Sequence, residues 1–210
     1  MPVEPAVKKT VAFIDGQNLY RAVKDAFGYT YPNYEVTKLA LEVCQSSGLM
    51  LEQVRFYTGV PEAIDDAFWH GFWAAKMRQM SWNQVHLFSR PLRYRNHRIR
   101  LPDGAEHAFL AAEEKGIDVR IALDIIHMAN HREYDVALVF SQDQDLSEVA
   151  DEIRSIAREQ DRWIKMASAF PVSPTYNNRR GINSTDWIKF DRALYDRCLD
   201  RRDYRPKPTP

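Results

Sequence analysis

Short apolar runs alternate with helical patterns along most of this chain, and that alternation constrains the fold more than any other feature. Compact apolar runs predict buried strands, and apolar residues recurring three or four apart predict amphipathic helices. The predicted strands are residues 11–14, 54–59, 84–88, 135–140, 163–167 and a short extra one at 184–190. The predicted helices are residues 17–27, 37–45, 64–80, 105–114, 119–130, 146–159 and 191–199. Because neighbouring parallel strands need crossover connections, this order predicts an α/β fold with a mainly parallel sheet and helices on both faces.

The length of 210 residues favours one domain, since domains usually span ~100–200 residues. We expect that domain over residues 8–200, followed by a disordered tail over residues 201–210. No apolar stretch approaches the ~18 residues of a membrane span, and residues 1–9 lack the apolar segment of a signal peptide. A cytoplasmic protein with no membrane association is therefore expected. Cys44 and Cys198 are too isolated for a disulfide framework or a metal knuckle.

Aspartates stand where the predicted strands end. Asp15 directly follows a buried run, and Asp143 and Asp145 follow the strand that ends at residue 140. In open parallel sheets the carboxyl ends of the strands meet at one edge, where functional groups gather. Asp118 and Asp124 lie just before and within a helix that could deliver both side chains to the same cleft. The sequence therefore predicts a cluster of carboxylates.

A cluster of carboxylates is costly without a proton or a cation, because like charges repel one another. Oxygen ligands suit hard cations such as Mg²⁺. Such an ion can orient a water molecule, lower its pKa and stabilise charge on a phosphate. These properties point to a metal-dependent nuclease in which water is the nucleophile.

Four of the five aspartates also have a simpler interpretation. Asp143 and Asp145 could cap the following helix, Asp118 could cap the helix after it, and Asp15 could belong to a turn with Gly16. Asp124 fits none of these roles, because it interrupts an apolar helix face. The coincidence of five acids near strand ends makes capping alone a weak explanation of the whole set.

Three segments, FIDGQN (13–18), KGIDVRIALD (115–124) and VFSQDQDL (139–146), together resemble the NYN family of PIN-like nucleases, in the branch close to the bacterial LabA-like proteins. The resemblance implies a PIN-like (Rossmann-like) sandwich and cleavage of single-stranded RNA with Mg²⁺ or Mn²⁺. It implies that Asp15 is both a catalytic acid and the first metal ligand, and that Asp118, Asp124 and Asp143 are further catalytic acids. Asp118 and Asp143 would also bind the metal, and Asp145 would be a neighbouring or alternate ligand.

The same resemblance suggests contacts with the substrate. Asn18 would orient Asp15 or the scissile phosphate, and the Ser141 hydroxyl would lie near phosphate. The sequence departs from the family at two positions, with Gln142 where the family usually has Gly and Leu146 where it has Phe. Because Gly permits a close approach of ligands, Gln142 could narrow the site. A non-catalytic RNA- or nucleotide-binding regulatory module is therefore the alternative function.

The segment from residue 90 to residue 100 carries five arginines and His97 but no acid. Because the chain has 29 basic and 29 acidic residues, this hairpin or long loop is the best local candidate for RNA contact. Its phosphate-binding side chains would be Arg90, Arg93, Arg95 and Arg98, with Arg100 beside them and Tyr94 or His97 stacking on a base. The alternative is a solvated edge strand whose charges prevent edge pairing.

Other residues are assigned little or no chemistry. No metal-ligand spacing is seen for the single histidines, namely His70, His86, His107, His127 and His131. The tryptophans are expected in the core or on the surface of a possible homo-oligomer, namely Trp69, Trp73 and Trp82. A dinucleotide-binding enzyme is excluded, because no G-x-G-x-x-G follows the first strand.

Overall fold

The fold is built on a parallel sheet of six strands. The computed structural model describes residues 2–100 and 106–206. The strand order is β3-β2-β1-β6-β7-β8, and every neighbouring pair is parallel. The strands are β1 (Lys9–Asp15), β2 (Met50–Val60), β3 (His86–Pro91), β6 (Val136–Phe140), β7 (Lys165–Pro171) and β8 (Asp186–Phe190). The predicted mainly parallel sheet is confirmed.

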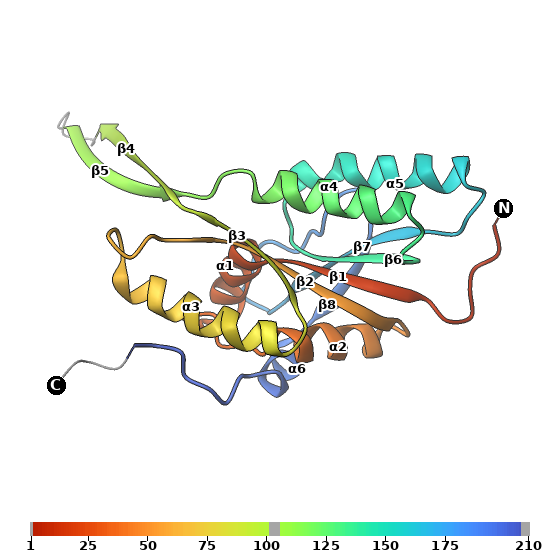
Figure 1. Ribbon diagram of the computed structural model, residues 1–210, viewed down its shortest axis with the longest axis horizontal. Helices are drawn as coiled ribbons and strands as arrows, with labels where there is room; N and C mark the ends of the chain where they lie inside the picture. The colour runs from red at the N-terminus through yellow and green to blue at the C-terminus, as the bar shows by residue number, and fades with distance from the viewer. Residues whose placement is uncertain (1, 101–105, 207–210) are drawn as a thin grey trace.

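Helices cover both faces of this sheet (Figure 1). One face carries α1 (Gly16–Phe27), α2 (Val36–Ser46), α3 (Ala67–Trp82) and α6 (Arg192–Arg197). The other carries α4 (Ile117–Asn130) and α5 (Ser147–Glu159), the latter preceded by a 3₁₀ turn, η1 (Gln144–Leu146). The chain therefore has the α/β sandwich architecture predicted from the alternation of strands and helices.

The central strand β1 separates two hydrophobic cores. Ala12 and Ile14 pack with α1, α2 and α3, whereas Val11 and Phe13 pack with α4 and α5. All four side chains are buried, because helices exclude water from both faces. This double burial explains why the strand is an uninterrupted apolar run rather than an alternating one.

The predicted end of the first helix is confirmed at Gly28. Its φ of 81° is left-handed, and its backbone N–H donates to the Lys24 carbonyl. Gly16 is needed for a different reason at the start of the same helix. A Cβ atom there would lie 2.6 Å from the Phe56 ring, so only glycine lets α1 begin this close to β2.

The basic segment forms an antiparallel arm, β4 (Arg93–Arg100) with β5 (Glu106–Glu113), which projects beyond the sheet (Figure 1). The basic segment was expected to form a hairpin or a long loop, and it forms one strand of a hairpin whose second strand comes from residues 106–113. The helix predicted for residues 105–114 is wrong, and residue 105 itself lies outside the described residues. Residues 106–113 pair along their whole length with β4, and this non-local ladder overrides a helix propensity worth only tenths of a kcal/mol per residue.

The tail expected to be disordered is described as far as residue 206. Tyr204 packs on α3, with its ring centroid 6.2 Å from that of Phe72, and its hydroxyl donates to Asp200. Residues 207–210 lie outside the described residues. Cys44 and Cys198 are buried free thiols. Within the described ranges no helix has both the length and the apolar character needed to cross a membrane.

Candidate metal centre

Three of the predicted aspartates line one cavity at the carboxyl edge of the sheet. Ile14 of β1 pairs with Phe140 of β6, so the two strands end side by side. Asp15 is the last residue of β1, Asp143 follows β6, and Asp118 lies in the first turn of α4. Their shared cavity has a volume of about 360 Å³. The fold thus brings together carboxylates from three separate segments.

Asp15 is the most buried of the three. One of its carboxylate oxygens accepts a hydrogen bond from the Asn18 backbone N–H at 3.0 Å, and the other accepts one from the Ser141 hydroxyl at 3.4 Å. Burial raises the pKa of Asp15 to about 6, and the nearby charge of Asp143 adds to this rise. At neutral pH the carboxylate is therefore charged at a cost, which a bound cation would reduce.

The turn after β6 is held by polar contacts to the same aspartates. The Ser141 hydroxyl accepts from the Asp143 backbone N–H at 3.1 Å, and an Asp143 carboxylate oxygen accepts from the Asp145 backbone N–H at 3.0 Å. The Asn18 side-chain carbonyl accepts from the Gln142 backbone N–H at 3.0 Å. Asp143 therefore caps η1 and lines the cavity, so the capping interpretation and the site interpretation are compatible.

Gln142 does not line the acidic cavity. Its side-chain amide donates to the Arg180 carbonyl at 2.7 Å, and its side-chain carbonyl accepts from the Tyr176 hydroxyl at 2.9 Å. The side chain thus anchors the loop between β7 and β8. Gln142, which replaces the family's glycine, therefore connects the turn after β6 to this loop and does not fill the acidic cavity.

Asp124 and Asp145 are placed away from this cavity. Asp124 accepts from the Tyr57 hydroxyl at 2.7 Å and pairs with Arg55 at 3.1 Å and Arg120 at 2.9 Å. Burial acts to raise the pKa of Asp124, but the hydrogen bonds from Tyr57 and Arg55 outweigh it and the pKa is lowered. Asp124 follows Asp118 by six positions, which is not a whole number of helical turns, so the two side chains leave α4 in different directions. Asp145 is exposed.

Glu114, like its neighbour Glu113, lines the cavity and was missed by the sequence analysis. Its carboxylate accepts from the Gly59 backbone N–H, and burial followed by the charge of Asp15 raises its pKa to about 7. This residue was missed because residues 105–114 were predicted to form a helix. The position of Glu114 immediately before the KGID segment could have indicated a place in the site. Gln17 and Arg21 on α1 also line the cavity, and the Arg21 charge acts to lower the pKa of both acids.

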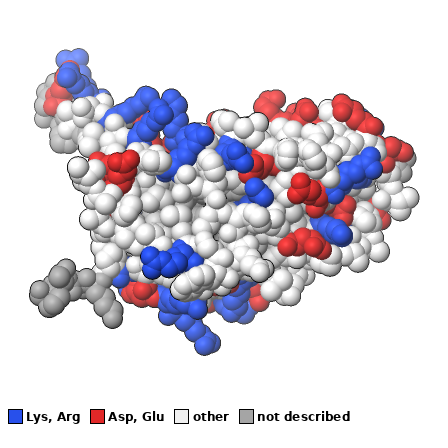
Figure 2. Space-filling view, viewed as in Figure 1, with Lys and Arg blue, Asp and Glu red and all other residues white. Residues whose placement is uncertain are grey.

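The predicted phosphate-binding arginines lie beside the acidic cavity rather than in it. Figure 2 shows Lys and Arg side chains gathered on the arm and on the adjoining edge of the body. Arg95 pairs with Glu113 at 3.3 Å, and Arg98 lies 3.9 Å from Glu106. Arg93 is opposite Glu113 in the ladder, and Arg90 at the end of β3 stacks over Phe88. Acids of β5 therefore offset part of the charge of β4.

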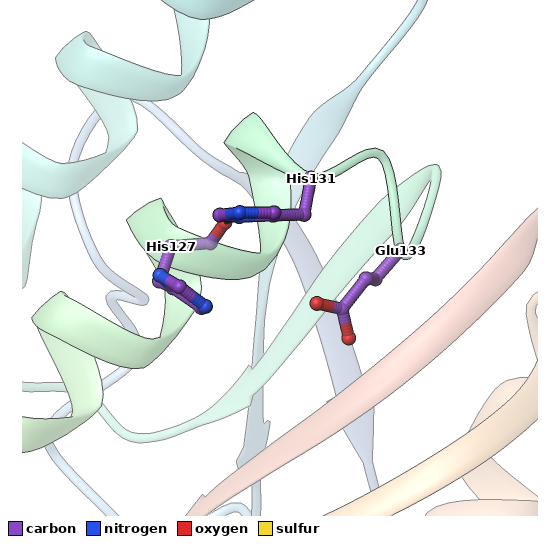
Figure 3. Close-up of side chains that lie close together, drawn as sticks. All are labelled: His127, His131 and Glu133. Atoms are coloured by element: carbon purple, nitrogen blue, oxygen red, sulfur yellow. Dashed lines mark hydrogen bonds between the residues drawn. The ribbon is translucent and has the colours of Figure 1, made fainter.

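The prediction that the histidines lack metal-ligand spacing is wrong for His127 and His131. They stand one helical turn apart near the end of α4, and Glu133 lies beside them (Figure 3). One potential ligand atom from each of the three lies within 4.8 Å of the others. An i, i+4 pair shares one helix face, so this signal was present in the sequence.

A parallel sheet with helices on both faces and an acidic cavity at its carboxyl edge defines a PIN-like α/β domain. The sequence matches the NYN domain over residues 9–159. The chain therefore belongs to the NYN domain family, whose members are generally nucleases. The LabA-like branch stays a prediction.

Solved structures with distant similarity were also found. A protein of unknown function from Vibrio parahaemolyticus is 18% identical, with 90% of this chain and 97% of that chain covered and a TM-score of 0.48. A deacetylase of teicoplanin biosynthesis, in complex with teicoplanin, is 15% identical, with 75% and 68% covered and a TM-score of 0.31. MurG from Acinetobacter baumannii is 10% identical, with 86% and 45% covered and a TM-score of 0.30. None of these three bears on the function of this chain, and no curated protein matches it.

Proposed function

We propose that this chain is a metal-dependent endoribonuclease that hydrolyses phosphodiester bonds of single-stranded RNA. The observation that carries the proposal is the shared cavity of Asp15, Asp118 and Asp143, whose lining also includes Glu113 and Glu114. Membership of a nuclease family supports it. The alternative of a non-catalytic module depended on Gln142 obstructing the site, and Gln142 instead binds the loop between β7 and β8.

The donor set fits a hard divalent cation. All the candidate ligands are carboxylate oxygens, which Mg²⁺ and Mn²⁺ prefer over nitrogen or sulfur. Burial, with a smaller contribution from the charge of Asp143, raises the pKa of Asp15, so a cation beside this carboxylate would stabilise its charged form. We propose Asp15, Asp118 and Asp143 as the ligands. A bound Mg²⁺ or Mn²⁺ would supply an activated water and charge stabilisation on the scissile phosphate.

The protein's own groups would position the substrate around this centre. Asn18 and Ser141 hold the turn that carries Asp143 against Asp15, so we assign them a positioning role. Among the described residues, Arg21 is the cation that lines the cavity, and it is placed to attract a phosphate. The arginines of the arm would attract the RNA backbone from the side. Glu114 completes the acidic wall.

Cleavage of a single-stranded RNA by purified protein with Mg²⁺ or Mn²⁺ tests the proposal. Asp143→Asn is expected to abolish cutting, and chelation of the metal should have the same effect. Asp186→Asn is the matched control, because Asp186 is exposed and pairs with Lys165 outside the cavity. Equal cleavage by the wild type and the Asp143 variant would contradict the proposal.

An RNA substrate and two free thiols agree with the expected cytoplasmic location.

A further inference from the structure

A second cavity adjoins the acidic one and is lined by aromatic side chains. Its volume is about 390 Å³, and the two cavities share Gln17, Arg21 and Ala112. Its walls come from α1, α3 and the base of the arm. The aromatic side chains that line it are Tyr20, Trp69, Trp73 and Tyr94. A group bound here would therefore lie next to a group held by the carboxylates.

Two of these rings, those of Trp69 and Trp73, are held by contacts with neighbouring aromatic side chains. Trp69 packs edge-on against Phe72, with ring centroids 5.1 Å apart, and Phe72 is fully buried. Trp73 is 7% exposed, whereas Trp69 and Tyr94 are half-buried and keep ring surface toward the cavity. Rings held in this way lose little freedom when they bind a flat ligand.

The size and chemistry of this aromatic cavity suit a nucleobase. A volume of about 390 Å³ is within the ~300–1,000 Å³ of small-molecule pockets. Aromatic faces stack on any base, and Gln17 and Asp66 add polar groups to the wall. A base inside a duplex could enter only after unpairing and unstacking, at a cost that a single strand does not have.

We propose that the aromatic cavity binds an unpaired base of RNA, stacked on Trp69, in the nucleotide next to the scissile phosphate. Arg21, which lines both cavities, would hold the phosphate between them. The inference rests on the proposed function, since it assigns a base-binding subsite to the same active site. It gives a physical reason for a preference for single-stranded over double-stranded RNA.

Binding, rather than cleavage, tests this subsite. In an Asp143→Asn background, single-stranded RNA containing 2-aminopurine at one position would be titrated with protein. Stacking on an aromatic side chain is expected to quench the probe, and Trp69→Ala should weaken binding roughly 5- to 100-fold. Trp69→Phe should restore most of the affinity. Tyr94→Ala should also weaken binding, and because Tyr94 lies on the arm, outside the core, this variant replaces Trp69→Ala in the test if Trp69→Ala does not fold.

The matched control is Trp82→Ala. Trp82 lies at the end of the same helix, is 72% exposed and does not line the aromatic cavity, so affinity should stay unchanged. If Trp69→Ala folds and binds RNA as tightly as the parent, the subsite is refuted. Because cutting is not measured, a failure of the nuclease proposal appears separately, as an absence of cleavage by the wild type.

A different observation, the cluster of His127, His131 and Glu133, carries a second inference. All three side chains are exposed, and they converge at the end of α4 (Figure 3). The 14 residues of α4 span about 20 Å, and Asp118 of the acidic cavity lies in the first turn. This histidine cluster is therefore remote from the proposed nuclease site.

Local contacts prepare the histidine cluster for a cation. The His131 Nδ1 lies 2.8 Å from the His127 carbonyl, which can only accept, so Nδ1 donates to it and Nε2 is the nitrogen left to face a metal. Arg132 adopts a left-handed φ of 59°, and the Glu133 backbone N–H then donates to the Met128 carbonyl at 3.0 Å. These contacts hold the Glu133 segment against the helix end, where the helix dipole favours positive charge.

We propose that His127, His131 and Glu133 bind a transition-metal ion of the zinc type, with water in the fourth position. Two imidazoles and a carboxylate suit Zn²⁺, whereas the all-carboxylate cavity suits Mg²⁺ or Mn²⁺. A metal bound here would join the last turn of α4 to the segment before β6 and stabilise the folded chain by mass action.

Calorimetric titration of metal-free protein with Zn²⁺, in excess Mg²⁺ to occupy the acidic cavity, tests the histidine cluster. One zinc ion per chain is expected, with at least tenfold weaker binding for His127→Gln and for His131→Gln. His86→Gln is the control, because His86 is an exposed histidine on β3 outside the cluster. Unchanged affinity in both cluster variants would refute the site. If zinc instead causes two chains to associate around one shared ion, the proposal of water as the fourth ligand is refuted.

Discussion

The burial of Asp15 has a measurable effect on stability. Burial raises the pKa of this carboxyl from an ordinary 3.8 to about 6, so its charged form is disfavoured in the folded protein. Asp15→Asn keeps the size of the side chain and a good helix-capping residue but removes the charge. We expect the variant to be more stable than the wild type at neutral and alkaline pH when no metal is present.

The magnitude follows from the difference between the two pKa values. A change from 3.8 to about 6 corresponds to about 3 kcal/mol in the free energy of unfolding. Because the folded pKa is the higher one, protonation of Asp15 favours the folded protein below pH 3.8, and this advantage is lost as the pH rises through about 6. The variant should thus match the wild type near pH 3.5 and exceed it by about 3 kcal/mol at pH 8.

Urea denaturation with EDTA at several pH values between 3.5 and 8 measures this difference. Excess Mg²⁺ should narrow the gap at pH 8, because the proposed metal binds only the folded wild type strongly. Asp186→Asn provides a control for the loss of an exposed carboxylate. A gap that is the same at every pH would refute the electrostatic reasoning.

Three further outcomes are expected. Glu114→Gln should lower the rate of cleavage and remove the rise in rate near pH 7 that ionisation of this carboxyl would produce. Initial rates measured from pH 5 to 9 test this expectation. A pH profile identical to that of the wild type would contradict it. Asp124→Asn should lower the free energy of unfolding by about 2–4 kcal/mol because it leaves Arg55 without its carboxylate, yet cleavage by the folded variant should persist. Weaker RNA binding, with a logarithmic salt slope smaller by about 2, is expected after alanine replacement in the arm. The residues replaced together would be Arg93, Arg95 and Arg98.

Local patterns in the sequence were sufficient for the parallel sheet and the helices that cover it, but not for the second strand of the arm. Uninterrupted apolar runs such as residues 11–14 and 136–140 are typical of parallel strands covered on both faces, and the carboxyl ends of such strands meet at one edge. The cluster of Asp15 and Asp143 follows directly from that rule. The spacing of His127 and His131 was also readable, because an i, i+4 pair depends only on helix geometry.

Only the tertiary structure decided which polar residues share a cavity. Asp118 and Asp124 both belong to α4, but the packing of that helix turns Asp118 toward Asp15 and Asp124 toward Arg55. Glu114 reaches the acidic cavity because residues 106–113 form a strand of the arm, against their local helix preference. The aromatic cavity likewise joins α1, α3 and the arm, which are distant in sequence. Periodicity reports which face of an element is buried, whereas the meeting of distant side chains depends on non-local packing that no local pattern contains.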